Sequence, residues 1–147
     1  MVARVASVLF ACNSNAVRSP MAEAVLKHYH GHRIYVDSVG VRAGEPDPFL
    51  VTVMAELGLD TSRHRSKSFE ELGDHSFDLV ITLTPEAQHR AVELTRTMAI
   101  EVEYWPTFDP TIIEGSRETV LAAYREVRDG LMRRILERFP VEAAASV

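Results

Sequence analysis

The residues best suited to chemistry lie near the start of the chain, where Cys12 is followed six positions later by Arg18. A thiolate is a strong nucleophile, and a guanidinium offers a planar pair of donors to the oxygens of a phosphate. The pair therefore indicates attack by sulfur on a bound tetrahedral oxyanion, with a phosphocysteine as the intermediate. Cys12 is the single cysteine of the sequence, so the other interpretations are a buried apolar filler or an intermolecular partner.

The segments on either side of this pair favour the chemical interpretation. Residues 5–10 (VASVLF) form an apolar run that predicts a buried strand ending just before Cys12. Ser19-Pro20 predicts an N-cap and a first-turn proline for a helix that runs to about Tyr29. A loop between a strand end and a helix N-terminus can direct backbone N–H groups and the helix dipole at an anion, and these also stabilise a thiolate. We therefore expect the following residues to bind the substrate: Asn13, Ser14, Asn15, Ala16, Val17, Arg18 and Ser19.

Two of these residues have an expected supporting role as well. Ser19 can donate its hydroxyl to the thiolate. Asn15 can hold the loop in shape, because asparagine tolerates the left-handed backbone that a tight turn often demands.

The rest of the sequence alternates between predicted strands and predicted helices. Short apolar runs predict further strands at residues 34–36, 77–83 and 101–105. Capping and proline signals predict helices at 47–57 and 84–95, and an apolar stripe at three- and four-residue steps predicts a last helix over 120–139. This alternation predicts a parallel sheet covered on both faces, with the ligand at the carboxyl ends of the strands, where Cys12 lies.

The bulk composition excludes several classes of function. A length of 147 residues with 46% hydrophobic and 25% charged residues matches one globular domain over residues 1–147. A formal net charge of −5 without a long Lys/Arg run gives no electrostatic basis for a nucleic-acid partner. No segment approaches the roughly 20 apolar residues of a membrane span, and the apolar run near the start is too short for a signal peptide. We therefore expect no membrane partner and a cytoplasmic location.

The segment from Cys12 to Pro20 consists of a cysteine, five residues and then Arg-Ser-Pro, continued by Met21-Ala22-Glu23. In these residues the chain resembles the low-molecular-weight protein tyrosine phosphatase superfamily. The resemblance extends through Asp37-Ser38, the turn at residues 57–60, the FDLVITL segment and the late Asp109-Pro110 pair. It implies a flavodoxin-like three-layer α/β sandwich, with a four-stranded parallel sheet in the order 2-1-3-4 and helices on both faces.

The resemblance also implies an activity and its residues. Asp109 stands at the position of the family's general acid, which protonates the leaving oxygen and then acts as a base toward water. The alternative for Asp109 is an ordinary Asp-Pro turn. Ser38 and His64, with Asn15 and Ser19, are the implied supporting residues, and a solvated surface histidine is the alternative for His64. The implied activity is hydrolysis of phosphate monoesters, above all protein phosphotyrosine, without a cofactor or metal. The expected partner is a phosphorylated protein or a small phosphate or arsenate oxyanion.

Three departures from the family pattern bear on the substrate and on oxidation. Ser14 stands where the family often has glycine, and Val17 stands where many phosphatases carry a second cysteine that protects the nucleophile. Oxidised Cys12 would therefore need repair by an external thiol. Thr111-Ile112-Ile113 stands where phosphotyrosine-selective members place tyrosines around an aryl pocket. These departures leave the substrate class open.

Two other functions are compatible with the same loop. The stretch from Asp37 through the last helix resembles the thioredoxin-coupled arsenate reductases, which share the fold and the loop. The positions of their two relay cysteines hold Thr84 and Ala91, so arsenate reduction here would require an external small thiol such as glutathione or mycothiol. The other function is a non-catalytic module that binds an oxyanion or a phosphoprotein.

Several remaining patterns have structural interpretations. His28, His30 and His32 are spaced two apart, so on a helix they point to different faces and make a poor metal site. Tyr104 and Trp105 are expected in the core or in the wall of the active site, and residues 41–46 are expected to border the pocket. The arginines of the last helix lie opposite its apolar stripe and are expected to form a solvated face: Arg125, Arg128, Arg133, Arg134 and Arg138.

Overall fold

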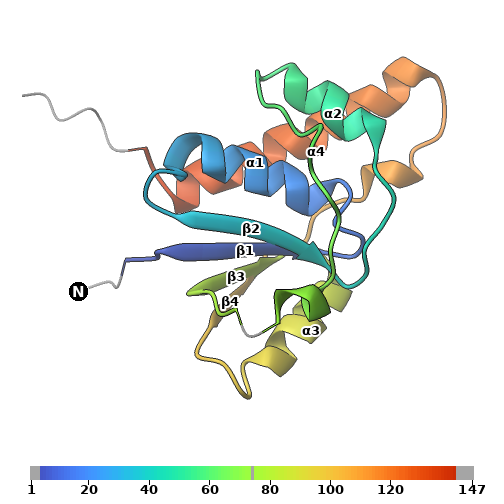
Figure 1. The fold of residues 1–147 in the computed structure, drawn as a ribbon. Helices are drawn as coiled ribbons and strands as arrows, with labels where there is room; N and C mark the ends of the chain where they lie inside the picture. Colours follow the sequence, from blue (N-terminus) through green and yellow to red (C-terminus); the bar gives the residue numbers. More distant parts are fainter. Residues whose placement is uncertain (1–3, 74, 142–147) are drawn as a thin grey trace, which may run out of the picture.

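The computed structural model describes residues 4–73 and 75–141, so the ends of the predicted domain, residues 1–3 and 142–147, lie outside the described residues. Four parallel strands form one sheet in the order β2-β1-β3-β4, which confirms the predicted topology (Figure 1). The strands are β1 (Ser7–Cys12), β2 (Tyr35–Gly40), β3 (Leu79–Thr82) and β4 (Glu101–Tyr104).

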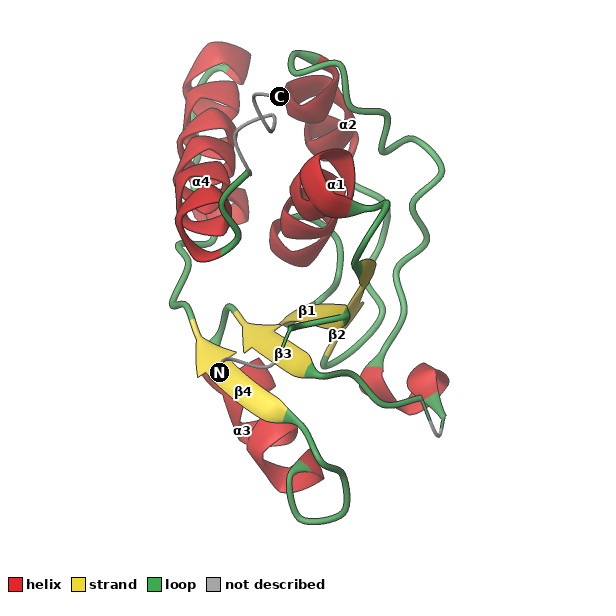
Figure 2. Cartoon of the chain, turned by 90° about the vertical axis from the view of Figure 1, so that its left-hand side faces the viewer, coloured by secondary structure: helices red, strands yellow, loops and turns green. Residues whose placement is uncertain are grey.

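Helices cover both faces of this sheet, as Figure 2 shows. On one face lie α1 (Arg18–His30), α2 (Pro48–Ala55) and α4 (Arg117–Arg138), and on the other lies α3 (Pro85–Leu94). Two 3₁₀ turns, η1 (Phe69–Leu72) and η2 (Pro110–Ile112), were not predicted. Among the described residues, no helix has the length and apolar character needed to cross a bilayer.

The core is divided by the sheet into two clusters, and β1 contributes to both. Side chains alternate along a strand, so Val8, Phe10 and Cys12 point to the side of α1, α2 and α4, whereas Leu9 and Ala11 point to the side of α3. All five are at most 2% exposed. The Cys12 side chain is therefore directed into the layer where α1 begins.

The topology also fixes where a ligand site can form. The chain leaves β1 for β2 on one side and returns to β3 on the other side, so the connections diverge at the carboxyl end of β1. In parallel sheets such a switch point opens a crevice between diverging loops. Cys12, the last residue of β1, lies at this point and pairs with Gly40 of β2.

The observed bounds differ from the predicted ones where side-chain pattern and backbone pairing disagree. β1 begins and ends two residues later than predicted, and β2 continues to Gly40 rather than stopping at Val36. The polar pair Asp37-Ser38 hides this continuation in the sequence, although the backbone pairs with β1 throughout. The last helix begins earlier than predicted because the Ser116 hydroxyl caps it by accepting from Thr119 N–H at 3.2 Å.

The predicted N-cap role of Ser19 is wrong. Helix α1 begins at Arg18, its N-cap is Val17, and no side chain caps it. Ser19 is fully buried in the first turn, where its hydroxyl is turned toward Cys12. The prediction failed because a serine before a proline also suits a first-turn residue that faces a site.

The predicted solvated face of α4 is wrong for Arg128 and incomplete for its neighbours. Arg128 is 8% exposed, and its Nη1 donates to Val53 O at 2.7 Å and to Glu56 Oε1 at 2.8 Å. Arg125 binds the same Glu56 carboxylate, so these arginines tie α4 to the end of α2.

Nearer its C-terminus, α4 uses arginines to cover the sheet. The Arg134 guanidinium lies 4.9 Å from the centre of the Trp105 ring, and Arg138 pairs with Glu103 at 2.8 Å. Trp105 is buried and packs near Phe10 in the core, whereas Tyr104 is 38% exposed. Arg133 is exposed, as predicted.

Candidate active site

The segment of residues 12–18, here called the oxyanion loop, surrounds the sulfur of Cys12. Cys12 is 2% exposed at the end of β1. The backbone N–H of Asn15 donates to its Sγ at 3.3 Å, and the Ser19 Oγ lies 3.0 Å from the same sulfur. The sulfur therefore faces polar hydrogen-bonding groups, although its strand is otherwise buried among apolar side chains.

Asn15 gives the oxyanion loop its shape. It is fully buried with φ at 53°, in the left-handed region that asparagine tolerates better than most residues. Its Nδ2 donates to Ser19 Oγ at 2.8 Å and to Ser38 Oγ at 2.9 Å. Its Oδ1 accepts from Lys67 N–H at 2.9 Å, so both the NH₂ group and the oxygen of this amide have partners.

The carbonyl of Asn15 is held from a third direction by the segment that precedes η1. His64 Nε2 lies 2.7 Å from Asn15 O, and Ser66 Oγ donates to it at 2.8 Å. A carbonyl only accepts, so Nε2 of His64 carries the proton. The structure thus brings His64 to the oxyanion loop rather than leaving it on the surface. Ser66 and Lys67 were missed, because nothing in their local sequence marks them as loop contacts.

The segment after β2 packs against the outside of the oxyanion loop. The N–H groups of Val41, Arg42 and Gly44 donate to the carbonyls of Cys12, Asn13 and Ser14, at 2.9, 2.9 and 2.8 Å respectively. These bonds occupy the loop carbonyls, which would otherwise repel an anion. The predicted segment at residues 41–46 therefore borders the loop through its backbone.

Gly40 permits this close packing. A Cβ at this position would lie 2.7 Å from Asn15 N, 2.8 Å from Asn13 O and 2.5 Å from Arg42 O. All three neighbours are backbone atoms, so no side-chain movement could relieve the contacts. The site requires glycine here for proximity.

Arg18 and Asp109 meet where residues 105–113, here called the acid loop, cross the start of α1. Arg18 Nη1 donates to Thr107 O at 3.0 Å, and its Nη2 lies 3.9 Å from Asp109 Oδ2. The Asp109 Oδ1 accepts from the N–H and the hydroxyl of Thr111, at 2.9 and 2.6 Å. One carboxylate oxygen therefore holds a turn, while the other faces the guanidinium.

The surroundings of Asp109 include a buried phenol. Tyr124 donates its hydroxyl to Asp47 Oδ2 at 2.7 Å, and its ring packs 5.3 Å from that of Phe49. Burial, the bond to Asp47 and the charge of Asp109 raise the pKa of Tyr124 above its ordinary value, so the phenol stays protonated. Tyr124 thereby links α4 to the N-cap of α2.

The histidine triplet does not converge. His30 is buried and its Nε2 lies 2.8 Å from Phe139 O, whereas the His28 ring packs on Tyr29. Within residues 4–73 and 75–141, no three His, Cys, Asp or Glu side chains are grouped so that they could hold a metal ion. The candidate site therefore consists of the oxyanion loop, its supports and the acid loop.

Comparison with known proteins agrees with this geometry. The family model for low molecular weight phosphotyrosine protein phosphatases matches residues 7–138, so the chain belongs to this family of cysteine-dependent enzymes. The arsenate reductase of Bacillus licheniformis is 33% identical over 129 residues, which cover 88% of this chain and 91% of that protein.

Two solved structures extend the comparison. The low molecular weight protein tyrosine phosphatase from T. tengcongensis has a TM-score of 0.75 at 26% identity, covering 91% of this chain and 99% of that one. The YwlE arginine phosphatase from Geobacillus stearothermophilus has a TM-score of 0.73 at 25% identity, covering 88% of each chain. The names of these similar proteins differ in substrate, so family membership leaves the substrate of this chain to its own residues.

Proposed function

We propose that this protein hydrolyses phosphate monoesters through a phosphocysteine on Cys12, with phosphotyrosine in proteins as the substrate class. The observation that carries the proposal is the surroundings of the Cys12 sulfur, which accepts from Asn15 N–H at 3.3 Å and lies 3.0 Å from the Ser19 hydroxyl. Both groups can donate to a thiolate, the attacking form of cysteine. A buried apolar filler would need neither.

The proposed reaction has two steps that balance. The thiolate attacks phosphorus, an S–P bond forms, and the bond from phosphorus to the ester oxygen breaks as Asp109 gives that oxygen its proton. Asp109 then takes a proton from water, the water oxygen attacks phosphorus, and the S–P bond breaks to release phosphate and restore the thiolate. Arg18 and the loop N–H groups stabilise the phosphoryl oxygens in both steps.

A second candidate is arsenate reduction with an external small thiol, and the 33% identity to an arsenate reductase favours it. Arsenate would condense with the Cys12 thiol with loss of water. The external thiol would then attack the Cys12 sulfur, and the S–As electron pair would pass to arsenic, leaving arsenite and a mixed disulfide. A second thiol would reduce that disulfide, because the sequence holds no other cysteine.

One side-by-side experiment tests both candidates. The purified protein is assayed at mildly acidic pH for hydrolysis of an aryl phosphate and a phosphotyrosine peptide, and for arsenate reduction with and without glutathione or mycothiol. We expect hydrolysis that Cys12→Ser abolishes while the variant still binds phosphate by calorimetry. Arsenite formed only with added thiol, without hydrolysis, would favour the reductase. Phosphate binding without turnover of either substrate would favour a non-catalytic module, and hydrolysis by Cys12→Ser at the parent rate would overturn the nucleophile assignment.

A further inference from the structure

A continuous chain of side-chain hydrogen bonds runs from the Cys12 sulfur away from the acid loop and ends at Glu23 on α1. Ser19 Oγ lies 3.0 Å from Cys12 Sγ, and Asn15 Nδ2 donates to Ser19 Oγ at 2.8 Å and to Ser38 Oγ at 2.9 Å. Ser38 Oγ then donates to Glu23 Oε1 at 2.5 Å. Asn15, Ser19 and Ser38 are each at most 1% exposed.

The proton positions along this chain follow from its two ends. The Asn15 amide is oriented by Lys67 N–H, an obligate donor to its Oδ1, so its NH₂ group must face both serines. A carboxylate only accepts, so Ser38 directs its one proton at Glu23 and accepts from Asn15.

Ser19 consequently accepts from Asn15 and keeps one proton for two possible acceptors. These are the Cys12 sulfur at 3.0 Å and Val39 O at 3.2 Å. When the sulfur is a thiol, its S–H can donate to Ser19 and the Ser19 proton turns to Val39 O. When the sulfur is a thiolate, the Ser19 proton turns to it. The chain thus leaves the Ser19 proton available to a thiolate, with Val39 O as the competing acceptor.

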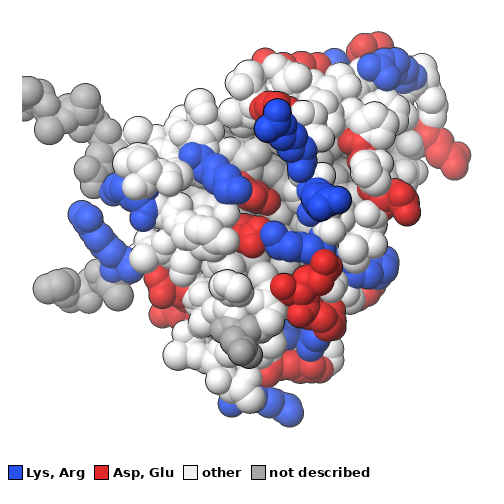
Figure 3. Space-filling view, in the orientation of Figure 1, with Lys and Arg blue, Asp and Glu red and all other residues white. Residues whose placement is uncertain are grey.

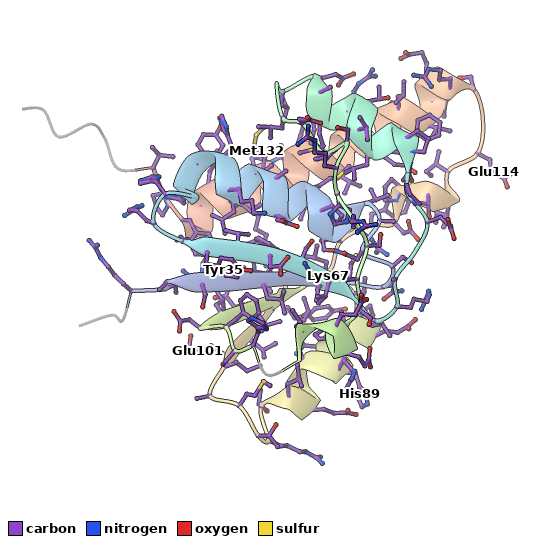
Figure 4. The ribbon with its side chains drawn as sticks, in the orientation of Figure 1. Tyr35, Lys67, His89, Glu101, Glu114 and Met132 are labelled. Carbon is purple, nitrogen blue, oxygen red and sulfur yellow. The ribbon has the colours of Figure 1, made fainter. Side chains whose placement is uncertain are left out.

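Glu23 is placed to keep this direction while staying in reach of solvent. Its side chain is 13% exposed, and its other oxygen pairs with Lys27 one turn along α1 at 2.5 Å. Asp37 of β2 and Lys67 pair with each other at 2.6 Å. Glu23 lines an open pocket of about 410 Å³ together with further charged side chains, which are Lys27, Asp37, Asp60, Arg63, Arg65 and Lys67. Figure 4 shows Lys67 beside the carboxyl end of β2. The face of the molecule drawn in Figure 3 carries side chains of both signs.

We propose that Glu23 is a positioning residue that acts through Ser38 and Asn15 to direct the Ser19 proton at Cys12. The proposal deepens the proposed function, because it rests on Cys12 as the reactive thiolate. Without an acceptor at position 23, the Ser38 hydroxyl loses the partner that fixes its oxygen. The Asn15 amide keeps its bond from Lys67 N–H but is held less firmly at its NH₂ group, so its bond to Ser19 is weakened.

The test measures the rate at which iodoacetamide alkylates Cys12 at fixed, mildly acidic pH. Cys12 is the single thiol, so the reaction reports on it alone and needs no turnover. We expect Glu23→Ala to slow alkylation about fivefold, equal to about 1 kcal/mol for one hydrogen bond. Glu23→Gln should stay within about twofold of the parent, because its amide oxygen still accepts from Ser38. Lys27→Gln, which removes only the outer ion pair, is the matched control and should also stay within about twofold.

A double-mutant cycle separates a positioning role from a structural one. If Glu23 acts through Ser38, Ser38→Ala alone and the Glu23→Ala/Ser38→Ala pair should alkylate at the same reduced rate, because the second change removes nothing further. Independent effects that multiply in the pair, or parent-like alkylation in Glu23→Ala, would overturn the proposal.

Glu23→Met, which keeps side-chain length without an acceptor, replaces Glu23→Ala if that variant does not fold. If Glu23→Ala is alkylated at the parent rate while the parent hydrolyses aryl phosphate, the inference fails and the proposed function stands. If Glu23→Ala is alkylated slowly while the parent hydrolyses no aryl phosphate, the inference stands and the proposed function fails.

Discussion

The oxyanion loop and the acid loop meet at Arg18, yet they are built in opposite ways. The oxyanion loop is bonded from α1, from β2 and its following segment, and from residues 64–67, and Asn15 at its centre is fully buried. The acid loop reaches it through Arg18 and holds Asp109 in a local turn. Its side chains Phe108 and Ile112 are 54% and 64% exposed.

This difference indicates a division of labour. A buried, fully bonded loop is preorganised and can stabilise the same tetrahedral oxyanion whatever group it is attached to. In the proposed function, the exposed acid loop with its apolar side chains faces the rest of the substrate, and exposed loops tolerate change. The similar proteins are named for different substrates, which fits a preorganised loop that can serve the same tetrahedral oxyanion in each.

The largest expected effect comes from the residue at the junction. Arg18→Lys keeps the charge but loses the forked pair of donors, so kcat/KM for an aryl phosphate should fall by about 10²- to 10³-fold. Steady-state kinetics check this, with the exposed Arg42→Lys as the matched control at the edge of the same loop. A loss below about threefold would mean that the backbone N–H groups of the oxyanion loop bind the phosphoryl group without the forked donors of Arg18.

The next effect isolates the acid loop. Asp109→Asn should lower kcat about 10²-fold for a poor leaving group such as phenyl phosphate and only a few-fold for an activated nitrophenyl ester. Asp60 is a matched control, because it makes the same turn, accepting from the Ser62 N–H and hydroxyl at 2.9 and 2.6 Å. Asp60→Asn should leave kcat for both esters unchanged. Equal losses on both esters in Asp109→Asn would remove it from the acid role.

A third change separates backbone from side chain within the oxyanion loop. Asn15→Ala should lower the free energy of unfolding by about 2–4 kcal/mol, through left-handed strain plus unpaired buried partners. Asn15→Gly should recover about 1–2 kcal/mol, because glycine adopts that backbone freely, but should not restore activity. Urea denaturation with a parallel activity assay measures both. Full activity in Asn15→Gly would show that the side-chain bonds are dispensable.

The smallest effect concerns acid stability and lies at the end of α2. The bonds to Arg125 and Arg128 hold the pKa of Glu56 at about 2, below its ordinary value of about 4.5. A carboxyl with a lowered folded-state pKa contributes stability above about pH 4.5 that is lost as the pH falls toward 2. The Tm difference between the parent and Glu56→Gln should therefore be constant above pH 5 and shrink toward pH 2, with activity near neutral pH unchanged. Glu118→Gln, the exposed partner at 3.4 Å from Arg125, is the control that should show little change. A pH-independent difference would contradict the assignment.

The strand order was implied by the resemblance to the low-molecular-weight protein tyrosine phosphatase superfamily. The alternation of strands with helices and the place of the oxyanion loop were predicted from local signals: short apolar runs, an apolar segment before Cys12, and a proline in the first turn after Arg18. These signals are physical, because burial and capping act over a few residues.

The remaining features depend on contacts that are distant in sequence. Ser66 and Lys67 reach Asn15 from more than 50 positions away, and no local pattern marks them. Arg128 looked solvated because its spacing is that of the outer face, yet it is buried against the end of α2. Ser19 satisfied a capping pattern, but its hydroxyl faces the sulfur. These errors have the same cause: a sequence pattern describes one helix or strand by itself and carries no information about the residues that pack against it.

The empty position at Gly40 has a consequence for variants that carry an intact Cys12 and Arg18. A single methyl group there would strike the amide of residue 15 from behind and push it off the sulfur, so the thiol would survive while losing its hydrogen bond. An inactivating change can thus arise on a neighbouring strand, outside the signature that identifies the protein, and a search for intact motifs would pass it as functional.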